Sequence, residues 1–247
     1  MMKRALISPC LILALFCFPL AADAAIITLD ATDSGWYDAT GEHTAANANY
    51  LTGLCGSACS SHPTEHRGFW VFDLSAVTDP ITSAVLNLFN PDYNSVDASE
   101  ILAIMDVSTP IAQLTAGGTG LTGIFDDLGT GTTYGTATGT DADDNQTIGI
   151  TLNSFAIQDL NNASGLFGFG GYLTTLQPSL IQFLFGNSSG TSLRQLRLET
   201  QDAVNPNPQT GGPSSVPEPS TLVLALAGLV LALAARRLVP ATRKSSR

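Results

Sequence analysis

Short runs of alternating apolar and polar residues fill the middle of the chain, and turn-forming residues separate the runs. In residues 84–90, Leu86 and Leu88 share one side of an extended chain and Asn87 takes the other, which is typical of a half-buried β-strand. Strands are predicted in this way at residues 26–29, 68–74, 84–90, 100–107, 146–152, 166–173, 180–185 and 193–200.

One segment has a different spacing. Phe155, Ile157 and Leu160 do not alternate, and Asn153 or Ser154 ahead of them is a good helix cap, so a short helix is predicted at residues 155–161. About eight strands and one helix indicate an all-β protein, which we predict to be a jelly-roll-like β-sandwich.

Two neighbouring predicted strands contain a recognisable sequence pattern. Phe72-Asp73-Leu74-Ser75 is followed by Ile81, Ser83, Ala84, Leu86 and Leu88. This pair resembles strands of jelly-roll domains in secreted bacterial proteins, some of them related to carbohydrate-binding modules. The resemblance covers part of the domain and implies the fold. For these residues we favour a role as core strands over a role as a sugar-binding face.

The charge of the chain is unevenly distributed. Residues 25–216 contain three arginines, no lysine and 19 acidic residues, a formal charge of 3 − 19 = −16. Such a surface repels phosphate, so nucleic acid is excluded as a partner. Charged residues make up only 13% of the chain and apolar ones 44%, which favours a packed core over disorder. We expect residues 25–203 to form one β domain.

Residues 1–24 have the three parts of a secretory signal peptide. Lys3 and Arg4 make the start of the chain basic, residues 5–20 are apolar, and Ala22-Asp23-Ala24 is a small-x-small cleavage site. We therefore expect export and cleavage after Ala24.

The C-terminal part is also divided into distinct segments. Residues 204–216 form a Pro/Gly-rich linker, and residues 217–247 contain an apolar helix at about 221–239. The helix is just long enough to span a membrane, and the positive charges that begin at Arg236-Arg237 favour a cytoplasmic tail. A permanent single-span anchor and a transient one both fit this arrangement.

The order of these segments resembles the PEP-CTERM sorting signal of Gram-negative bacteria. The matching parts are Pro217-Glu218-Pro219, the apolar residues 221–235 and the Arg236-Arg237 cluster. The resemblance implies recognition by an exosortase, removal of the tail near the motif, and a transient stay in the inner membrane. It also implies a destination at the cell surface or in the extracellular matrix, associated with exopolysaccharide and biofilm.

Cysteine and histidine residues cluster in one loop. Cys55, Cys59, His62, Glu65 and His66 all lie within twelve residues. A Cys55–Cys59 disulfide is the favoured interpretation, because the exported chain meets an oxidising environment. Zinc bound by the two cysteines and two histidines is the second interpretation. The text also fits H-x-x-E-H, the motif of a zinc-dependent hydrolase, but that motif needs a helix and a proline interrupts it here.

An acidic turn raises the question of calcium. Asp141, Asp143 and Asn145 resemble the start of a calcium loop, and their oxygen atoms are ligands that Ca²⁺ prefers. Gln146 and Leu152 stand where an EF-hand needs Gly and Glu, so the turn is not an EF-hand. A solvated turn is favoured over a looser calcium site, and no cofactor is otherwise expected.

The functional expectation follows from these features. No catalytic arrangement is found, so we expect a non-enzymatic, matrix-associated protein with a structural or adhesive role. The alternative is a lectin-like module that binds extracellular polysaccharide, with Trp36 and Trp70 as the residues that would stack on sugar rings. A zinc-dependent hydrolase is the third and least favoured class.

Overall fold

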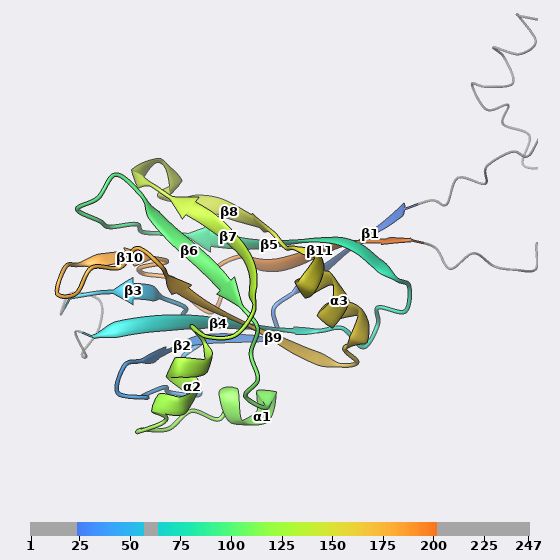
Figure 1. Cartoon of the computed structure of the whole chain (residues 1–247), viewed down its shortest axis with the longest axis horizontal. Helices are drawn as coiled ribbons and strands as arrows, with labels where there is room; N and C mark the ends of the chain where they lie inside the picture. The colour runs from blue at the N-terminus through green and yellow to red at the C-terminus, as the bar shows by residue number, and fades with distance from the viewer. Residues whose placement is uncertain (1–23, 57–63, 202–247) are drawn as a thin grey trace, which may run out of the picture. The chain divides into compact units, whose positions relative to one another are not determined.

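The computed structural model in Figure 1 describes residues 24–56 and 64–201. The chain divides into two units, Met1–Val204 and Asn205–Arg247, and all described residues belong to the first. The predicted signal peptide up to residue 23, the linker, the Pro217-Glu218-Pro219 motif and the apolar C-terminal segment lie outside the described residues. In the part that is described, no helix is long and apolar enough to cross a membrane.

The described chain is mostly β-structure with a few short helices. The strands are β1 (Ala24–Asp30), β2 (Asp33–Asp38), β3 (Thr52–Leu54), β4 (Glu65–Asp73), β5 (Ile81–Asn90), β6 (Glu100–Met105), β7 (Thr133–Gly139), β8 (Gln146–Thr151), β9 (Leu166–Leu173), β10 (Gln182–Leu184) and β11 (Arg194–Gln201). The helices are α1 (Ile111–Leu114), α2 (Thr122–Asp127), α3 (Ser154–Asn162) and the 3₁₀ turn η1 (Asp141–Asp143).

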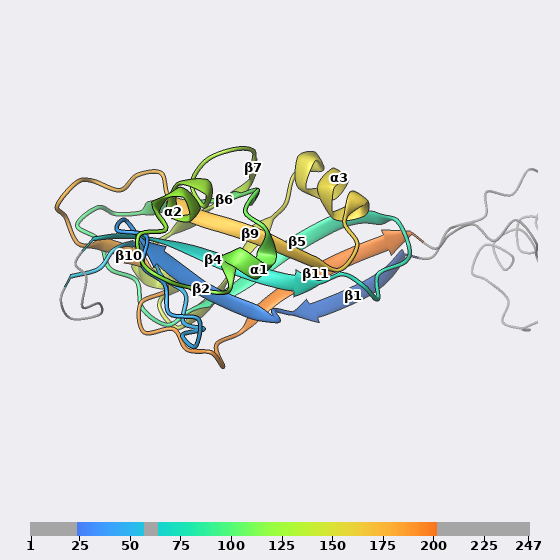
Figure 2. The same ribbon diagram turned by 90° about the horizontal axis from the view of Figure 1, so that it is seen from below.

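The strands form two antiparallel sheets (Figures 1 and 2). The first is four-stranded, in the order β1-β11-β5-β8. The second is seven-stranded, in the order β10-β3-β4-β9-β6-β7, with β2 also paired to β4. Because β1 pairs with β11 from Ala24↔Gln201 to Asp30↔Gln195, the two ends of the described domain lie side by side at one end of the molecule.

The main core lies between the two sheets. Leu86 of β5 and Leu196 of β11 reach into it from the smaller sheet, and Trp70 and Phe169 reach into it from the larger one. In β5 every second residue from Ala84 to Asn90 is buried, as the alternation in the sequence predicts. The prediction of a mostly β protein with two antiparallel sheets is confirmed.

Strand β4 is buried on both faces, which explains the continuous run of apolar residues from Phe69 to Phe72. Phe69 and Val71 point away from the main core and pack in a second cluster with Leu114 of α1 and Phe125 of α2. The Tyr37 hydroxyl donates a hydrogen bond to the Leu114 carbonyl oxygen at 2.9 Å and ties α1 to β2. The larger sheet is therefore covered on its outer face by α1 and α2 (Figure 1).

All eight predicted strands are present, and so is the predicted helix, α3. Of the two candidate caps the structure selects Asn153, whose side-chain oxygen accepts hydrogen bonds from the backbone N–H groups of Phe155 and Ala156. The expectation of a single helix was wrong, because α1 and α2 are also helical. Residues 117–139, for which no strand or helix was predicted, contain α2 and β7. The short strands β2 and β3 were also missed.

Candidate functional site

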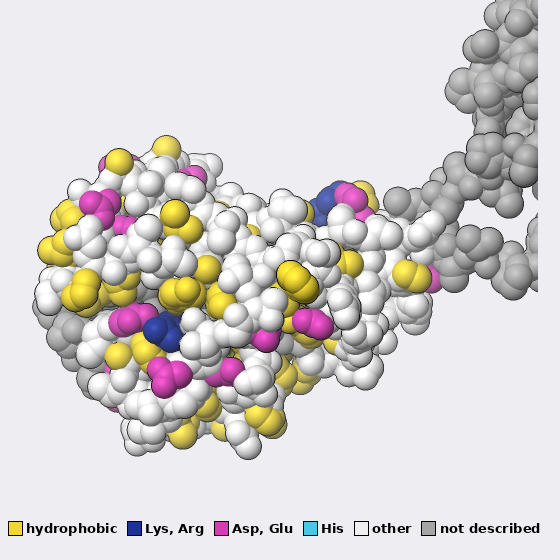
Figure 3. Space-filling model, in the orientation of Figure 1, with side chains coloured by type: hydrophobic (Ala, Val, Ile, Leu, Met, Phe, Trp, Pro, Cys, Tyr) yellow, Lys and Arg dark blue, Asp and Glu magenta, His cyan; other side chains and the backbone are white. Residues whose placement is uncertain are grey.

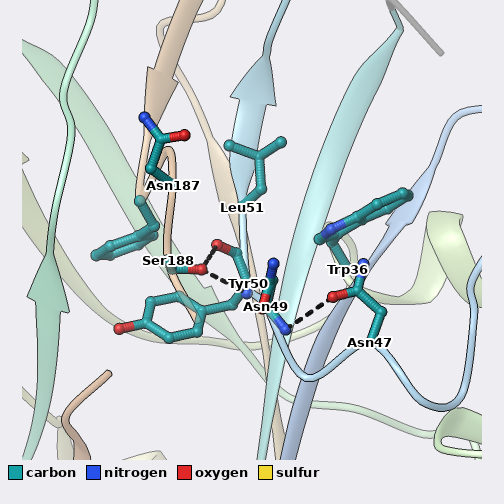
Figure 4. Close-up of a pocket in the computed structure, with 8 residues that line it drawn as sticks. Trp36, Asn47, Asn49, Tyr50, Leu51, Asn187 and Ser188 are labelled. Carbon is teal, nitrogen blue, oxygen red and sulfur yellow. Dashed lines mark hydrogen bonds between the residues drawn. The ribbon is translucent and has the colours of Figure 1, made fainter. Parts of the chain in front are cut away.

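A shallow pocket of about 130 Å³ lies where three segments of the chain meet (Figure 4). Trp36 comes from β2, residues 47–51 come from the loop that precedes β3, and residues 185–188 follow β10. The lining residues are Trp36, Asn47, Asn49, Tyr50, Leu51, Phe185, Asn187 and Ser188, so no charged side chain is among them.

The floor of the pocket is rigid because it belongs to the main core. Tyr50 and Phe185 are both fully buried, and their ring centroids lie 5.2 Å apart. The Tyr50 hydroxyl donates to the Phe89 carbonyl oxygen at 2.7 Å. Burial raises the pKa of Tyr50 well above its usual value, so the phenol stays protonated and keeps this bond over the physiological pH range.

The two loops that form the walls are joined by one serine. The Ser188 hydroxyl accepts a hydrogen bond from the Tyr50 backbone N–H at 2.8 Å and donates one to the Tyr50 carbonyl oxygen at 2.5 Å. Both bonds are drawn in Figure 4. The side chain thus takes the place of a β-strand partner for Tyr50 and fixes the distance between the walls.

An arginine holds one wall from behind. The Arg194 guanidinium donates hydrogen bonds to the Ser34 hydroxyl at 2.7 Å and to the Ala48 carbonyl oxygen at 3.1 Å. The Ser34 hydroxyl in turn donates to the same Ala48 oxygen at 2.6 Å. A further bond to the Gly190 carbonyl oxygen occupies the other end of the guanidinium. Both terminal nitrogens of the Arg194 guanidinium are therefore engaged in hydrogen bonds that stabilise the loop containing Ala48.

The opposite wall carries backbone strain. Phe185 has a φ of 68° and Asn187 a φ of 55°, and a bulky residue such as phenylalanine rarely adopts positive φ. The Asn187 amide nitrogen donates to an Asp92 carboxylate oxygen at 2.9 Å, and the buried Phe185 ring holds the backbone in place. Strain of this kind persists only where surrounding contacts enforce it, and it is often found where ligands bind.

The two tryptophans have different roles. Trp36 is partly exposed, lines the pocket and makes an edge-to-face contact with His66, with ring centroids 4.7 Å apart. Trp70 is 0% exposed and lies in the main core, so the prediction that it stacks on a ligand was wrong. Phe69 and Val71 flank it in β4 and face the second cluster, so Trp70 points from the opposite face of the strand into the main core.

The cysteine–histidine loop is only partly described. Cys55 is buried and disulfide-bonded, and it is the only cysteine among the described residues. Cys59 and His62 lie outside them, so the Cys55–Cys59 pairing and the zinc alternative stay predictions. Glu65 and His66 begin the strand β4 and are not helical, which removes the helix that an H-x-x-E-H hydrolase requires.

The acidic turn uses the carboxylate of Asp143 for its own structure. Asp141 and Asp143 form the 3₁₀ turn η1, and one Asp143 carboxylate oxygen accepts hydrogen bonds from both the backbone N–H and the hydroxyl of Thr140. Asn145 follows with a φ of 56° and turns the chain into β8. Within residues 24–56 and 64–201, no group of three or more His, Cys, Asp or Glu side chains is arranged to hold a metal ion.

Most of the pocket was missed in the sequence. Asn47, Asn49, Asn187 and Ser188 come from segments about 140 residues apart, and no spacing rule joins them. Within the sequence, only the short polar segment Asn47-Ala48-Asn49 directly before Tyr50 indicates locally that a pocket wall could form there.

A comparison with known families finds a match at the C-terminal end of the chain. Residues 215–238 match the model of the PEP-CTERM protein-sorting motif. The matched range contains the Pro217-Glu218-Pro219 text, the apolar segment and Arg236-Arg237, so the predicted motif is confirmed. No curated protein is significantly similar to the chain. The chain therefore carries a PEP-CTERM sorting motif, which implies processing by an exosortase, export and association with the cell surface.

Proposed function

We propose that this is a non-enzymatic structural or adhesive protein that exosortase processing delivers to the cell surface or the extracellular matrix. The observation that carries the proposal is the pairing of Ala24 with Gln201, which puts both ends of the described domain at one end of the molecule. Strands β3 and β10 lie at the opposite end (Figures 1 and 2). A domain attached through its C-terminal side would thus be able to present that far end to the matrix.

We also infer that the sandwich is a jelly roll. The order β1-β11-β5-β8 in one sheet faces β4-β9-β6-β7 in the other, and the chain passes back and forth between the sheets as two Greek keys require. On this interpretation β2, β3 and β10 are additions beside β4. They extend the larger sheet at the end that bears the pocket, since Leu51 and Phe185 directly adjoin β3 and β10.

The use of acidic side chains supports a role other than catalysis. Glycoside hydrolysis needs two carboxyl groups facing a shared space. Here the Asp127 carboxylate accepts hydrogen bonds from the backbone and hydroxyl groups of Ser108 and Thr109, and Glu100 is buried against Ser95, Thr175 and Gln182. The first carboxylate fastens a loop to helix α2, and the second fastens loops to strand β6.

Charge supports the same proposal. Figure 3 shows acidic side chains scattered over the visible face with very few basic ones. Two of the domain's three arginines form salt bridges, Arg67–Glu65 at 2.9 Å and Arg197–Glu199 at 3.0 Å, and Arg194 is held in hydrogen bonds behind the pocket. An acidic surface keeps a secreted domain soluble and apart from other acidic polymers.

Binding of the exopolysaccharide is the alternative proposal. The partly exposed Trp36 beside three asparagines in the pocket favours it. A matrix protein that binds its own polysaccharide would combine both proposals in one molecule.

The proposal is tested by comparing a strain that has the exosortase with one that lacks it. We expect the protein in the matrix fraction of the first strain, with termini mapped by mass spectrometry near Ala25 and near Pro217–Pro219. Deletion of the gene for this protein should reduce cell attachment without loss of a hydrolytic activity. A protein that stays in the inner membrane with its C-terminus intact through Arg247 in both strains would contradict exosortase processing.

A further inference from the structure

The pocket lined by Trp36, Asn47, Asn49, Asn187 and Ser188 has the chemistry of a small sugar site. Side-chain amides carry both donors and acceptors, as sugar hydroxyls do. Among the described residues, no protein group bonds the side-chain amide of Asn49, which is exposed and lies between Ser188 and Trp36 in Figure 4. The Asn187 amide nitrogen donates a hydrogen bond to the Asp92 carboxylate, and this bond fixes the orientation of the Asn187 amide oxygen.

Trp36 adds an apolar surface to these polar groups. Its indole rests on one side against the buried cluster of Leu51, Cys55 and Phe183 and still lines the pocket. Sugar rings present C–H groups on one face and hydroxyls at the rim, so an indole flanked by amides matches both. At about 130 Å³ the hollow is smaller than the roughly 300 Å³ from which typical ligand pockets begin, which suits one sugar unit.

The pocket is also preformed. The two hydrogen bonds between Ser188 and Tyr50, the Arg194 contacts behind Ala48 and the enforced positive φ of Phe185 fix its walls without a ligand. A ligand therefore has little ordering cost to overcome in the protein.

The charges select a neutral ligand. The lining has no cation, and each of the three arginines of the domain is engaged elsewhere in hydrogen bonds or salt bridges. With 19 acidic residues in 25–216, an anionic sugar would be repelled. We propose that this pocket binds a single neutral sugar unit of a polysaccharide. The inference rests on the proposed surface function and names the ligand class that the adhesive end would take.

The test uses the exported protein recovered from the producing cells. The chain has two tryptophans and Trp70 is fully buried, so acrylamide quenching of fluorescence reports mainly on Trp36. Glucose, galactose, mannose and N-acetylglucosamine are titrated as neutral probes, and glucuronic acid as the anionic one. We expect at least one neutral sugar to protect Trp36, with a dissociation constant on the order of 1 mM, and glucuronic acid to give no protection.

Matched variants locate the site. Asn49→Ala should weaken binding about tenfold, because it removes a solvent-facing amide without breaking a protein contact. Asn162→Ala, at the exposed end of α3, should bind as the wild type does. Trp36→Ala should abolish binding measured by calorimetry.

Three results would overturn the pocket proposal: no protection by any neutral sugar, unchanged binding in Asn49→Ala, or stronger binding of glucuronic acid. Presence of the protein in the matrix fraction is measured independently. A protein that reaches the matrix but binds none of these sugars thus refutes the pocket proposal alone.

Discussion

Ser188 and Tyr50, 138 residues apart in the sequence, exchange two hydrogen bonds through a single hydroxyl group. The hydroxyl accepts from the Tyr50 N–H and donates to the Tyr50 carbonyl oxygen, and both residues are buried. A buried backbone amide that loses its partner costs free energy comparable to a hydrogen bond. These two bonds therefore join the walls of the pocket. They also supply hydrogen-bond partners to the backbone of Tyr50, which lies outside the strands.

We expect Ser188→Ala to destabilise the protein by about 1–3 kcal/mol, because it leaves a buried N–H and a buried carbonyl oxygen unbonded. Urea unfolding followed by circular dichroism measures the change. Ser154→Ala, at an exposed position at the start of α3, is the control and should change stability by no more than about 0.5 kcal/mol. Equal stability of the two variants would contradict the role of Ser188.

Asn161, at an exposed position near the end of α3, makes a similar pair of hydrogen bonds to the backbone of the buried Ile81. Its amide oxygen accepts from the Ile81 N–H at 2.8 Å, and its amide nitrogen donates to the Ile81 carbonyl oxygen at 2.9 Å. Asn161→Ala should therefore lower the unfolding free energy by about 1–3 kcal/mol. The neighbouring Asn162 is exposed like Asn161 but makes no such bridge to Ile81, so Asn162→Ala should have little effect. Both substitutions replace an asparagine of α3 by alanine and so have the same effect on helix propensity. The difference between the melting temperatures of the two variants therefore reports the bridge to Ile81.

The sequence pattern predicted the fold well where burial follows a simple period. Leu86 and Leu88 alternate in β5 because one face of that strand meets the core, and the text alone reveals it. Strand β7 was missed because its text, TYGTATG, has few apolar residues. Its pairing with β6 and the burial of Tyr134 define it instead. Long-range pairing overrode weak local propensity at this strand.

The site was harder to predict for a related reason. Trp36 and Trp70 look alike as isolated aromatics, and only the covering of both faces of β4 separates a core residue from an exposed one. The walls of the pocket meet through Ser188 and Tyr50, and that contact depends on the tertiary fold rather than on spacing.

Trp70 should act on stability and not on ligand binding. Its indole packs against Tyr50 and Phe185, with ring centroids 5.7 Å and 5.9 Å away, and against Gly171, where an added Cβ would approach it to 2.8 Å. Trp70→Ala should cost about 3–5 kcal/mol through loss of buried area and a cavity. Trp70→Phe should remain folded and should keep the Trp36-dependent sugar binding. Loss of binding by a folded Trp70→Phe protein would contradict this assignment.

His43 should make the stability depend on pH. Its ring is buried against Tyr37 and Phe69, with centroids 4.9 Å and 5.1 Å away. Burial lowers its pKa below the usual 6.5, and the opposing effects of the Trp36 backbone and Asp33 are smaller. The unfolded chain therefore binds a proton at a higher pH than the folded one does. Stability is fully present above about pH 6.5 and declines as the pH falls toward the pKa of the folded state.

The variant His43→Leu isolates this effect, because it removes the titrating group and leaves the other histidines in place. Between about pH 7 and pH 5, the unfolding free energy of the wild type should fall relative to that of the variant, by at most about 1.4 kcal/mol per pH unit. Urea titrations across this range measure the difference at each pH. If the difference in unfolding free energy between the two proteins stayed constant with pH, His43 would have the same pKa in the folded and unfolded chains. That result would contradict the effect expected from its burial between two aromatic rings and its backbone bonds to Gly118.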